Sequence, residues 1–177
     1  HTLTLNIVAS GQVNVNGTNY SSPIQIDENS TVNLYANPNV GNHFVSWSDD
    51  ISSSNSTESF SMVSDFTITA TFEINTYTLS YSAGTNGSLS GATSQTVDHG
   101  ENGTAVTATP STGYHFVQWS DGATSNPRTD NNVTGNINVT AQLAINTYTV
   151  QYSAETGGNI SGNTSQTINY GANGTAV

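Results

Sequence analysis

Two short segments of the chain combine the residue types of a nucleophilic active site. Residues 113–122 read GYHFVQWSDG, and residues 41–50 read GNHFVSWSDD. Each segment holds a histidine, a serine and an aspartate, the residue types that a hydrolase uses as general base, nucleophile and orienting acid. The two segments therefore raise the question of a reaction centre that occurs twice.

The spacing within these segments argues against such a centre. On an unbroken strand, His115, Trp119 and Asp121 lie on one side, and Phe116 and Ser120 lie on the other. At roughly 3.3 Å per residue, His115 and Ser120 are about 17 Å apart. The letters WSDG also lack the strand–elbow–helix context that presents a catalytic serine. We therefore predict no catalytic residue and expect that the protein is not an enzyme.

The aromatic residues of the two segments have two interpretations. In the first, Phe44, Trp47, Phe116 and Trp119 are structural core residues, because aromatic side chains dominate the cores of small domains. The letters SDD and SDG then form turns. In the second, the two tryptophans are exposed platforms on which sugar rings stack. A module this small rarely leaves its largest apolar side chain in water, which favours the core.

Composition and charge restrict the partners of the chain. Its 177 residues include 12 acids, one arginine and no lysine, which gives a net charge of −11. Such a surface repels phosphate, so we expect no nucleic-acid partner. No stretch is long and apolar enough to span a bilayer, so we expect no direct membrane insertion. Cysteine is absent, which rules out disulfides and thiolate chemistry within this sequence.

Acidic side chains supply the only candidate metal ligands. Asp49, Asp50 and Asp121 are weak candidates for calcium, which prefers oxygen ligands and often stiffens extracellular arrays. No segment has the spacing of a calcium-binding loop. The 4 histidines form no pair at i and i+4 that would suit zinc. We predict no cofactor, with calcium as the one ion left open.

Acceptor sequences for N-glycosylation are frequent in this chain, which is rich in serine and threonine. If the source organism glycosylates its surface proteins, we expect some of these sites to be used. The asparagines that precede x-Ser or x-Thr, with x not proline, are Asn16, Asn19, Asn29, Asn55, Asn86, Asn102, Asn132, Asn138, Asn159, Asn163 and Asn173.

An internal repeat of about 71 residues organises the chain. The letters INTYTLSYSA at 74–83 recur as INTYTVQYSA at 145–154. The letters SQTVDHGENGTAV at 94–106 recur as SQTINYGANGTAV at 165–177. The first copy is more divergent but carries the same histidine–tryptophan segment. The predicted domains are module 1 at residues 1–75, module 2 at residues 76–146, and the N-terminal part of an incomplete module 3 at residues 147–177.

Each module is predicted to consist of β-strands. Apolar residues alternate with Thr and Ser over residues 66–72 and 77–82, which is typical of strands with one buried face. No window has helical periodicity, and one helical turn per module stays open. The predicted fold is all-β, a tandem array of small modules, each β-sandwich or β-grasp-like, like beads on a string. Asn-Gly and Gly-Gly pairs predict turns at 16–17, 86–87, 102–103, 157–158 and 173–174.

The order of these segments resembles the divergent InlB B-type repeat, also named the Listeria–Bacteroides-type repeat. The resemblance is close over residues 76–146 and looser over 1–75, where Asn42 stands in the place of Tyr114 and the letters NPRTD of 126–130 have no equivalent. It implies a small, mainly β module that occurs in tandem in large secreted and cell-surface proteins as a spacer, stalk or adhesive unit. It implies no catalytic residues.

Three hypotheses for the function follow, all of which place the protein outside the cell. The leading one is a non-enzymatic repeat region that acts as a stalk or adhesin of a large cell-surface protein. Its partners would be neighbouring repeats, surface glycans or other cell surfaces. The second is a subunit of a self-assembling filament, sheath or surface layer, in which identical chains complete the partial third module by strand addition. The third is an accessory carbohydrate-binding region of a secreted enzyme.

Overall fold

The computed structural model describes residues 1–19 and 22–177, which form two compact units. The described residues contain strands and no α-helix, so the all-β prediction is confirmed and the helical turn that the sequence left open is not formed. The structure accordingly offers no helix that could cross a membrane in the described part of the chain. Unit 1 comprises His1–Tyr77, Asp98–Glu101 and Asn132–Gly135, and unit 2 comprises Thr78–Val97, Asn102–Asn131 and Asn136–Val177.

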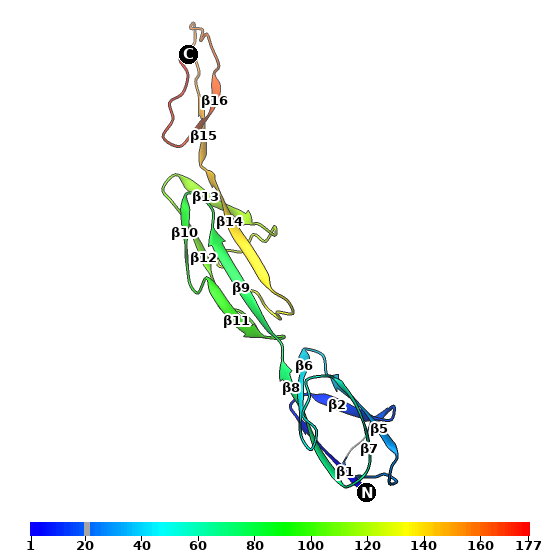
Figure 1. Cartoon of the computed structure of the whole chain (residues 1–177). Coiled ribbons are helices and arrows are strands. Elements are labelled where there is room, and N and C mark those ends of the chain that lie inside the picture. The colour runs from blue at the N-terminus through cyan, green and yellow to red at the C-terminus, as the bar shows by residue number, and fades with distance from the viewer. Residues whose placement is uncertain (20–21) are drawn as a thin grey trace. The chain divides into compact units, whose positions relative to one another are not determined.

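Unit 1 contains two four-stranded sheets (Figure 1). Its strands are β1 (Thr2–Val8), β2 (Gly11–Val15), β3 (Thr18–Asn19), β4 (Ile24–Gln25), β5 (Thr31–Pro38), β6 (Asn42–Asp49), β7 (Thr57–Ser61) and β8 (Phe66–Ile74). The strand orders are β4-β1-β8-β6 and β3-β2-β5-β7. In the first sheet, β1 and β8 are parallel neighbours, with Leu3 opposite Phe66. The first and last strands of the module therefore lie side by side in the middle of a sheet.

One apolar core fills the space between these two sheets. Alternate residues of β5 and β8 point into it, and the Thr and Asn residues between them face outward or are only partly buried, as period-two patterning requires. The sequence left a β-sandwich and a β-grasp-like arrangement open. Unit 1 has two sheets packed face to face, as in a sandwich, and the parallel pair of β1 and β8 lies in the middle of one of them. The buried residues of the core are Leu3, Leu5, Val13, Val15, Val32, Leu34, Ala36, Trp47, Met62, Ile68, Ala70 and Phe72.

The later strands repeat this order. They are β9 (Thr76–Ala83), β10 (Gly87–Ser90), β11 (Ser94–Asp98), β12 (Thr107–Pro110), β13 (Tyr114–Trp119), β14 (Ile137–Ile145), β15 (Thr147–Gln151) and β16 (Ser165–Asn169). The sheet β11-β9-β14-β13 again places the first and last strands of a module in parallel, with Leu79 opposite Ile137. Two further pairs, β10-β12 and β15-β16, are antiparallel.

Strand β13 contains an irregularity that its alternation does not predict. Its register against β14 shifts between Phe116 and Gln118, which leaves Val117 as an extra residue. The expectation that Phe116 and Trp119 lie on opposite sides of the strand was therefore wrong. An inserted residue reverses the alternation, and the two rings contact each other with centroids 5.8 Å apart. Strand β6 has the same shift at the equivalent position.

Two predicted turns lie a few residues earlier than expected. The chain reverses over Asp98–Glu101, where the Glu101 amide donates a hydrogen bond to the Asp98 carbonyl at 3.0 Å. The equivalent turn ends at Ala172, whose amide donates to the Asn169 carbonyl at 3.0 Å. The glycines with positive φ in these turns are those at 100 and 171, not those of the Asn-Gly pairs at 102–103 and 173–174.

Candidate functional site

Trp47 anchors the core of the first module. Its side chain is 1% exposed and lies on β6, packed against the half-buried ring of Phe44 with centroids 5.1 Å apart. Its indole N–H donates a hydrogen bond to the Asn55 carbonyl at 2.8 Å. The polar edge of the ring is thus satisfied inside the protein, as burial of a tryptophan requires.

Trp119 has the equivalent position in the second module. It is 0% exposed, and its indole N–H donates to the Ser125 carbonyl at 3.0 Å. The half-buried Phe116 packs against it, as does Tyr81, whose ring is steeply inclined to the indole at a centroid distance of 6.0 Å. Because neither tryptophan presents a ring face to solvent, the alternative in which Trp47 and Trp119 are sugar platforms is wrong.

The serine and histidine of the GYHFVQWSDG segment have separate partners. His115 Nδ1 lies 2.8 Å from the Asn146 side-chain oxygen, and Ser120 Oγ accepts a hydrogen bond from the Thr140 amide at 3.1 Å. In the first module, His43 Nδ1 lies 2.9 Å from the Asn75 side-chain oxygen. An amide oxygen only accepts, so Nδ1 of each histidine carries the hydrogen. In this tautomer the histidines position an asparagine. That the chain is not an enzyme stays a prediction.

These asparagines belong to a motif that sequence reasoning missed. Asn75 is the single residue between β8 and β9. Within unit 1, its amide donates to the Gly41 carbonyl at 2.8 Å, and its own carbonyl accepts the His99 amide at 2.8 Å. A Cβ atom at Gly41 would lie only 2.3 Å from the His99 ring, so glycine is required there. We name the set His43, Gly41, Asn75 and His99 the connecting motif.

Unit 2 contains a second copy of the connecting motif. Asn146 is the single residue between β14 and β15. Its amide donates to the Gly113 carbonyl at 2.8 Å, and its carbonyl accepts the Tyr170 amide at 2.8 Å. A Cβ atom at Gly113 would lie 2.2 Å from the Tyr170 ring. The signal that could have revealed the motif is the joint recurrence of Gly-x-His, Ile-Asn-Thr and an aromatic residue before glycine.

Arg128, the only arginine, is buried in an ionic cluster. Its side chain is 7% exposed and forms two hydrogen bonds to Asp130, from Nε at 2.8 Å and from Nη2 at 2.6 Å. Its Nη1 donates to Asp121 at 2.9 Å, and its guanidinium lies 5.6 Å from the centre of the Trp119 ring. The Tyr81 hydroxyl donates to Asp130 at 2.7 Å. We name Arg128, Asp121, Asp130 and Tyr81 the Arg128 cluster.

The Arg128 cluster fixes the charge state of each member. Hydrogen bonding to Asp130 raises the pKa of Arg128, and the hydrogen bond from Arg128 lowers the pKa of Asp121. Burial by itself would raise the pKa of Asp130, but the hydrogen bonds from Arg128 and Tyr81 outweigh it, and the net shift is downward. Burial and the bond to Asp130 raise the pKa of Tyr81. No member titrates near neutral pH, so the cluster suits structural stabilisation and not proton transfer.

The three aspartates named as weak calcium candidates are engaged within the protein. Asp49 accepts a hydrogen bond from the Thr69 hydroxyl at 2.5 Å, and Asp50 accepts one from the Thr67 amide at 2.7 Å. Asp121 belongs to the Arg128 cluster. Over the described ranges, no three His, Asp or Glu side chains are grouped as metal ligands. Calcium binding stays a prediction without a site.

Two glutamines explain the repeated letters SQT and NGT. The Gln95 side chain accepts the Thr104 amide at 2.6 Å and donates to the Thr104 carbonyl at 3.0 Å, as a neighbouring strand would do. Gln166, which is 7% exposed, binds Thr175 in the same way at 2.7 and 2.8 Å. A Cβ atom at Gly103 would lie 2.6 Å from Leu79. The Asn-Gly pair at 102–103 thus serves close packing and not a turn.

The predicted glycosylation acceptors lie on the surface of the structure. All the asparagines predicted as acceptors, from Asn16 to Asn173, are exposed. The acceptor sequence of Asn19 is completed by Ser21, which lies outside the described residues. Surface exposure is what attachment requires, and the use of these sites stays a prediction.

Comparison with known families assigns the chain. The divergent InlB B-repeat domain matches it twice, at residues 1–76 and 77–147. The chain therefore belongs to the divergent InlB B-repeat family, whose members typically occur in extracellular or surface proteins. Each match ends one residue later than the corresponding predicted module, at 1–75 or 76–146. Comparisons with curated proteins and with solved structures found no match.

Proposed function

We propose that the chain is a structural stalk segment of a larger extracellular protein, built to carry tension along the polypeptide. The observation that carries this proposal is the parallel pairing of the first and last strand in each module. The chain enters a module at the start of β1 and leaves it at the end of β8. These two points lie at opposite ends of a parallel strand pair.

Tension across such a pair acts in shear. Six residue pairs connect β1 and β8, from Leu3–Phe66 to Val8–Thr71, and five connect β9 and β14. A pull on the two chain ends of a module loads all the hydrogen bonds of the pair together, whereas an antiparallel pair pulled at one end opens one bond at a time. The module thus resists extension between its two chain ends.

The connections between modules support the same role. Only Asn75 separates β8 from β9, and only Asn146 separates β14 from β15. A one-residue connection contains no flexible linker that would extend under load. The hydrogen bonds of the connecting motif also hold the backbone on both sides of each asparagine.

The test is to pull the first module in two directions. The chain has no cysteine, so cysteine pairs introduced for attachment are its only thiols. The pair Thr2→Cys with Ile74→Cys loads β1 and β8 in shear. The pair Asn42→Cys with Ile74→Cys opens β6 from β8 at one end, where these two residues are opposite each other. In single-molecule force spectroscopy we expect the shear pair to unfold at the higher force. Equal forces would contradict the stalk proposal.

Surface location is a separate part of the proposal. Arg128 is the single trypsin site, and it is buried, so trypsin is a poor probe for this chain. Proteinase K cleaves without a need for lysine or arginine. We expect proteinase K to remove the chain from intact source cells, followed with an antibody against residues 1–147. Survival of the chain until the cells are lysed would contradict the location.

A further inference from the structure

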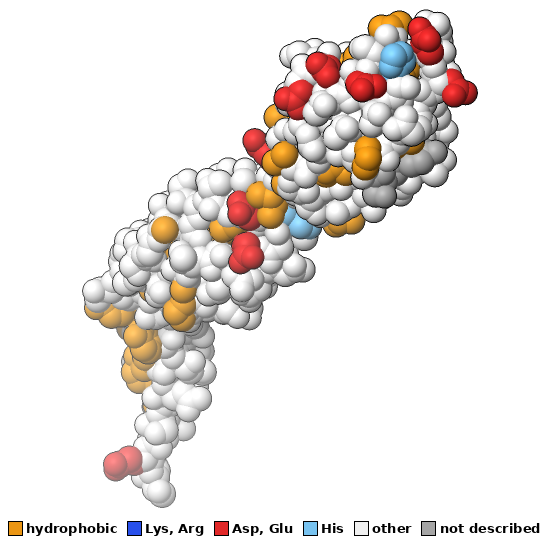
Figure 2. All heavy atoms as spheres, turned by 90° about the horizontal axis from the view of Figure 1, so that it is seen from below, with side chains coloured by type: hydrophobic (Ala, Val, Ile, Leu, Met, Phe, Trp, Pro, Cys, Tyr) orange, Lys and Arg blue, Asp and Glu red, His pale blue; other side chains and the backbone are white. Residues whose placement is uncertain are grey.

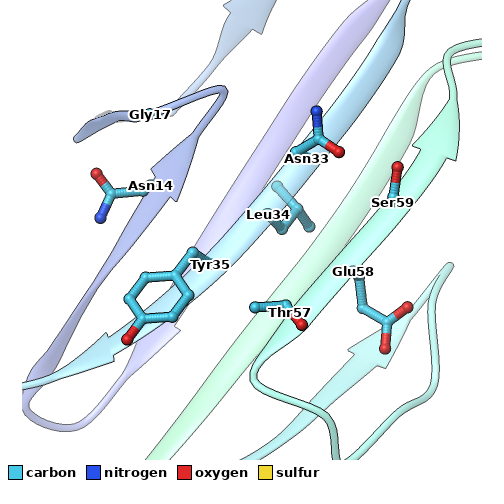
Figure 3. Close-up of a pocket in the computed structure, with 8 residues that line it drawn as sticks. All are labelled: Asn14, Gly17, Asn33, Leu34, Tyr35, Thr57, Glu58 and Ser59. Atoms are coloured by element: carbon cyan, nitrogen blue, oxygen red, sulfur yellow. The ribbon is translucent and has the colours of Figure 1, made fainter.

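The outer face of one sheet in unit 1 carries a depression that is separate from the parallel strand pair and from the connecting motif. It has a volume of about 660 Å³ and lies on β2, β5 and β7 (Figure 3). Tyr35 lies on the middle strand, β5, with Asn14 directly opposite on β2 and Thr57 directly opposite on β7. Asn33 and Ser59 form the adjacent pair on the same face. Figure 3 shows the Tyr35 ring between Asn14 and Thr57.

The side chains of this depression have unused hydrogen-bonding capacity. Tyr35 is 48% exposed. In residues 1–19 and 22–177, the side chains of Asn14, Tyr35, Thr57 and Ser59 form no hydrogen bond, whereas nearby polar side chains are paired. Asn33 donates to Asn16 at 3.3 Å. The centre of the face is therefore open to an external partner, and its edge is fixed by internal bonds.

We propose that this face binds a neutral carbohydrate, with a pyranose ring stacked on Tyr35. The apolar face of a sugar ring matches the aromatic face of Tyr35. Amide and hydroxyl groups both donate and accept, as sugar hydroxyls do, so Asn14, Thr57 and Ser59 suit the ring edge. This inference is independent of the stalk proposal, because it concerns the outer face of β2, β5 and β7 and not the parallel strand pair.

The negative charge of the chain favours a neutral ligand over an anionic one. The only arginine is buried in unit 2, and the net charge is −11. Figure 2 shows acidic side chains scattered over the visible face and no lysine or arginine. Glu58, an acidic residue opposite Leu34 on β7, also lines the depression. Sulfated, phosphorylated or uronic-acid polymers would thus meet repulsion without a cation to offset it.

The shape of the site suits a stretch of polysaccharide. Its volume of about 660 Å³ lies within the range of about 300–1,000 Å³ that is usual for ligand sites. The site lies on an exposed sheet face, where Thr57 and Ser59 are in contact with solvent. A long chain can therefore cross it without having to thread into a cavity.

The second module provides an internal control. Gly11 is opposite Pro38 in the first module, and Gly87 is opposite Pro110 in the second. Three residues further along, the pair Asn14–Tyr35 is replaced by Ser90–Thr107. The equivalent face of the second module therefore lacks the aromatic ring, and we expect sugar binding in the first module alone.

Affinity electrophoresis of the full chain, produced without glycans, tests the proposal. The probes are glucomannan, hydroxyethylcellulose and α-mannan in the gel, with dextran sulfate as the charged comparison. We expect at least one neutral polymer to retard the protein and dextran sulfate to leave it unretarded. Tyr35→Ala should weaken binding about tenfold or more, and Tyr35→Phe should keep it within about threefold. Tyr148→Ala removes another exposed tyrosine, on β15, and should change nothing.

A gain-of-function variant keeps the test independent of the stability of Tyr35→Ala. Ser90→Asn with Thr107→Tyr transfers the pair to the second module, and we expect stronger retardation from two sites in one chain. The proposal is overturned if no neutral polymer retards the protein, or if Tyr35→Ala binds as the wild type does. It is also overturned if Tyr35→Ala alters only the concentration dependence of sedimentation, because the face would then join copies of this chain. Unfolding forces are unaffected by either result, so the stalk proposal is tested separately.

Discussion

At the scale of single residues, Arg128 distinguishes the second module from the first. It is buried, it binds Asp130 through two hydrogen bonds and Asp121 through another, and it covers one face of Trp119. The first module has no arginine or lysine, so no such cluster lies beside its apolar core. The two modules thus share one fold and differ in how much of their stability is electrostatic.

Substitution of Arg128 tests this difference. We expect Arg128→Met to lower the free energy of unfolding of the second module by about 3 kcal/mol, because it leaves Asp130 buried without its cation. The measurement is urea unfolding followed through the two indole N–H signals in NMR spectra. Trp119 reports the second module, and Trp47 reports the first as the matched control. Equal loss at both tryptophans would contradict a local role.

Acid should remove the same contribution. Hydrogen bonds from Arg128 lower the pKa of Asp121, and those from Arg128 and Tyr81 outweigh burial at Asp130. In the unfolded chain an aspartate has a pKa of about 3.9. The unfolded state therefore binds protons first as the pH falls, so the stabilisation is complete above about pH 4 and is lost as the pH falls through the folded-state values.

The unfolding midpoints at pH 7, 5, 3 and 2 check this sign. We expect the Trp119 signal of the wild type and of Arg128→Met to differ most at pH 5–7 and to converge at the lowest pH. A gap that stays constant down to pH 2 would show that the ionic cluster does not cause the difference.

At the scale of elements, the β-bulge in β13 decides which residues enter the core. Alternation along the strand predicts opposite sides for Phe116 and Trp119, yet both pack together because Val117 is an extra residue. Val117 is 44% exposed, so its side chain contributes little burial. What the core needs from this position is a residue in the backbone and not a particular side chain.

A deletion and a substitution at Val117 separate these two contributions. Deletion of Val117 should turn Phe116 away from Trp119 and cost up to about 3 kcal/mol, the lower end of the range for a core phenylalanine, because Phe116 is half-buried. Val117→Thr keeps the β-branch and should stay within about 0.5 kcal/mol of the wild type. Urea unfolding followed at the Trp119 indole gives both values. Similar stability for the two variants would mean that the bulge does not set the register.

At the scale of the whole molecule, repulsion among the acids is an electrostatic cost of folding. The chain has 12 acids and one base, so compaction brings like charges together. Salt shortens the screening length from about 30 Å at 0.01 M to about 3 Å at 1 M. We expect the melting temperature to rise between 10 mM and 0.5 M NaCl, by roughly 4–8 °C for each kcal/mol recovered per module.

Neutralising one acid provides the control for this effect. Glu28 is exposed, and Glu28→Gln removes one charge without a buried partner. The variant should melt at a higher temperature than the wild type in 10 mM NaCl and close to it in 0.5 M NaCl. A melting temperature that falls with salt would mean that attractive pairs dominate the surface.

Local patterns in the sequence determined the repeat, the strands and the family. The recurrence of INTYT and SQT, and the alternation of apolar residues with Thr and Ser, need only neighbouring residues, and the all-β fold and the family followed from them. Burial of Trp47 and Trp119 follows from module size. Which acids bind Arg128 did not follow from such patterns.

Only the tertiary structure decided which distant residues meet. Tyr81 and Asp130 are 49 positions apart and share a hydrogen bond, and Asn14 and Tyr35 form one face because β2 pairs with β5 in one register. The bulge at Val117 is likewise a property of two strands together. The physical reason is that alternation is a local constraint, whereas register is set across strands, and a shift of one residue turns every side chain to the other face.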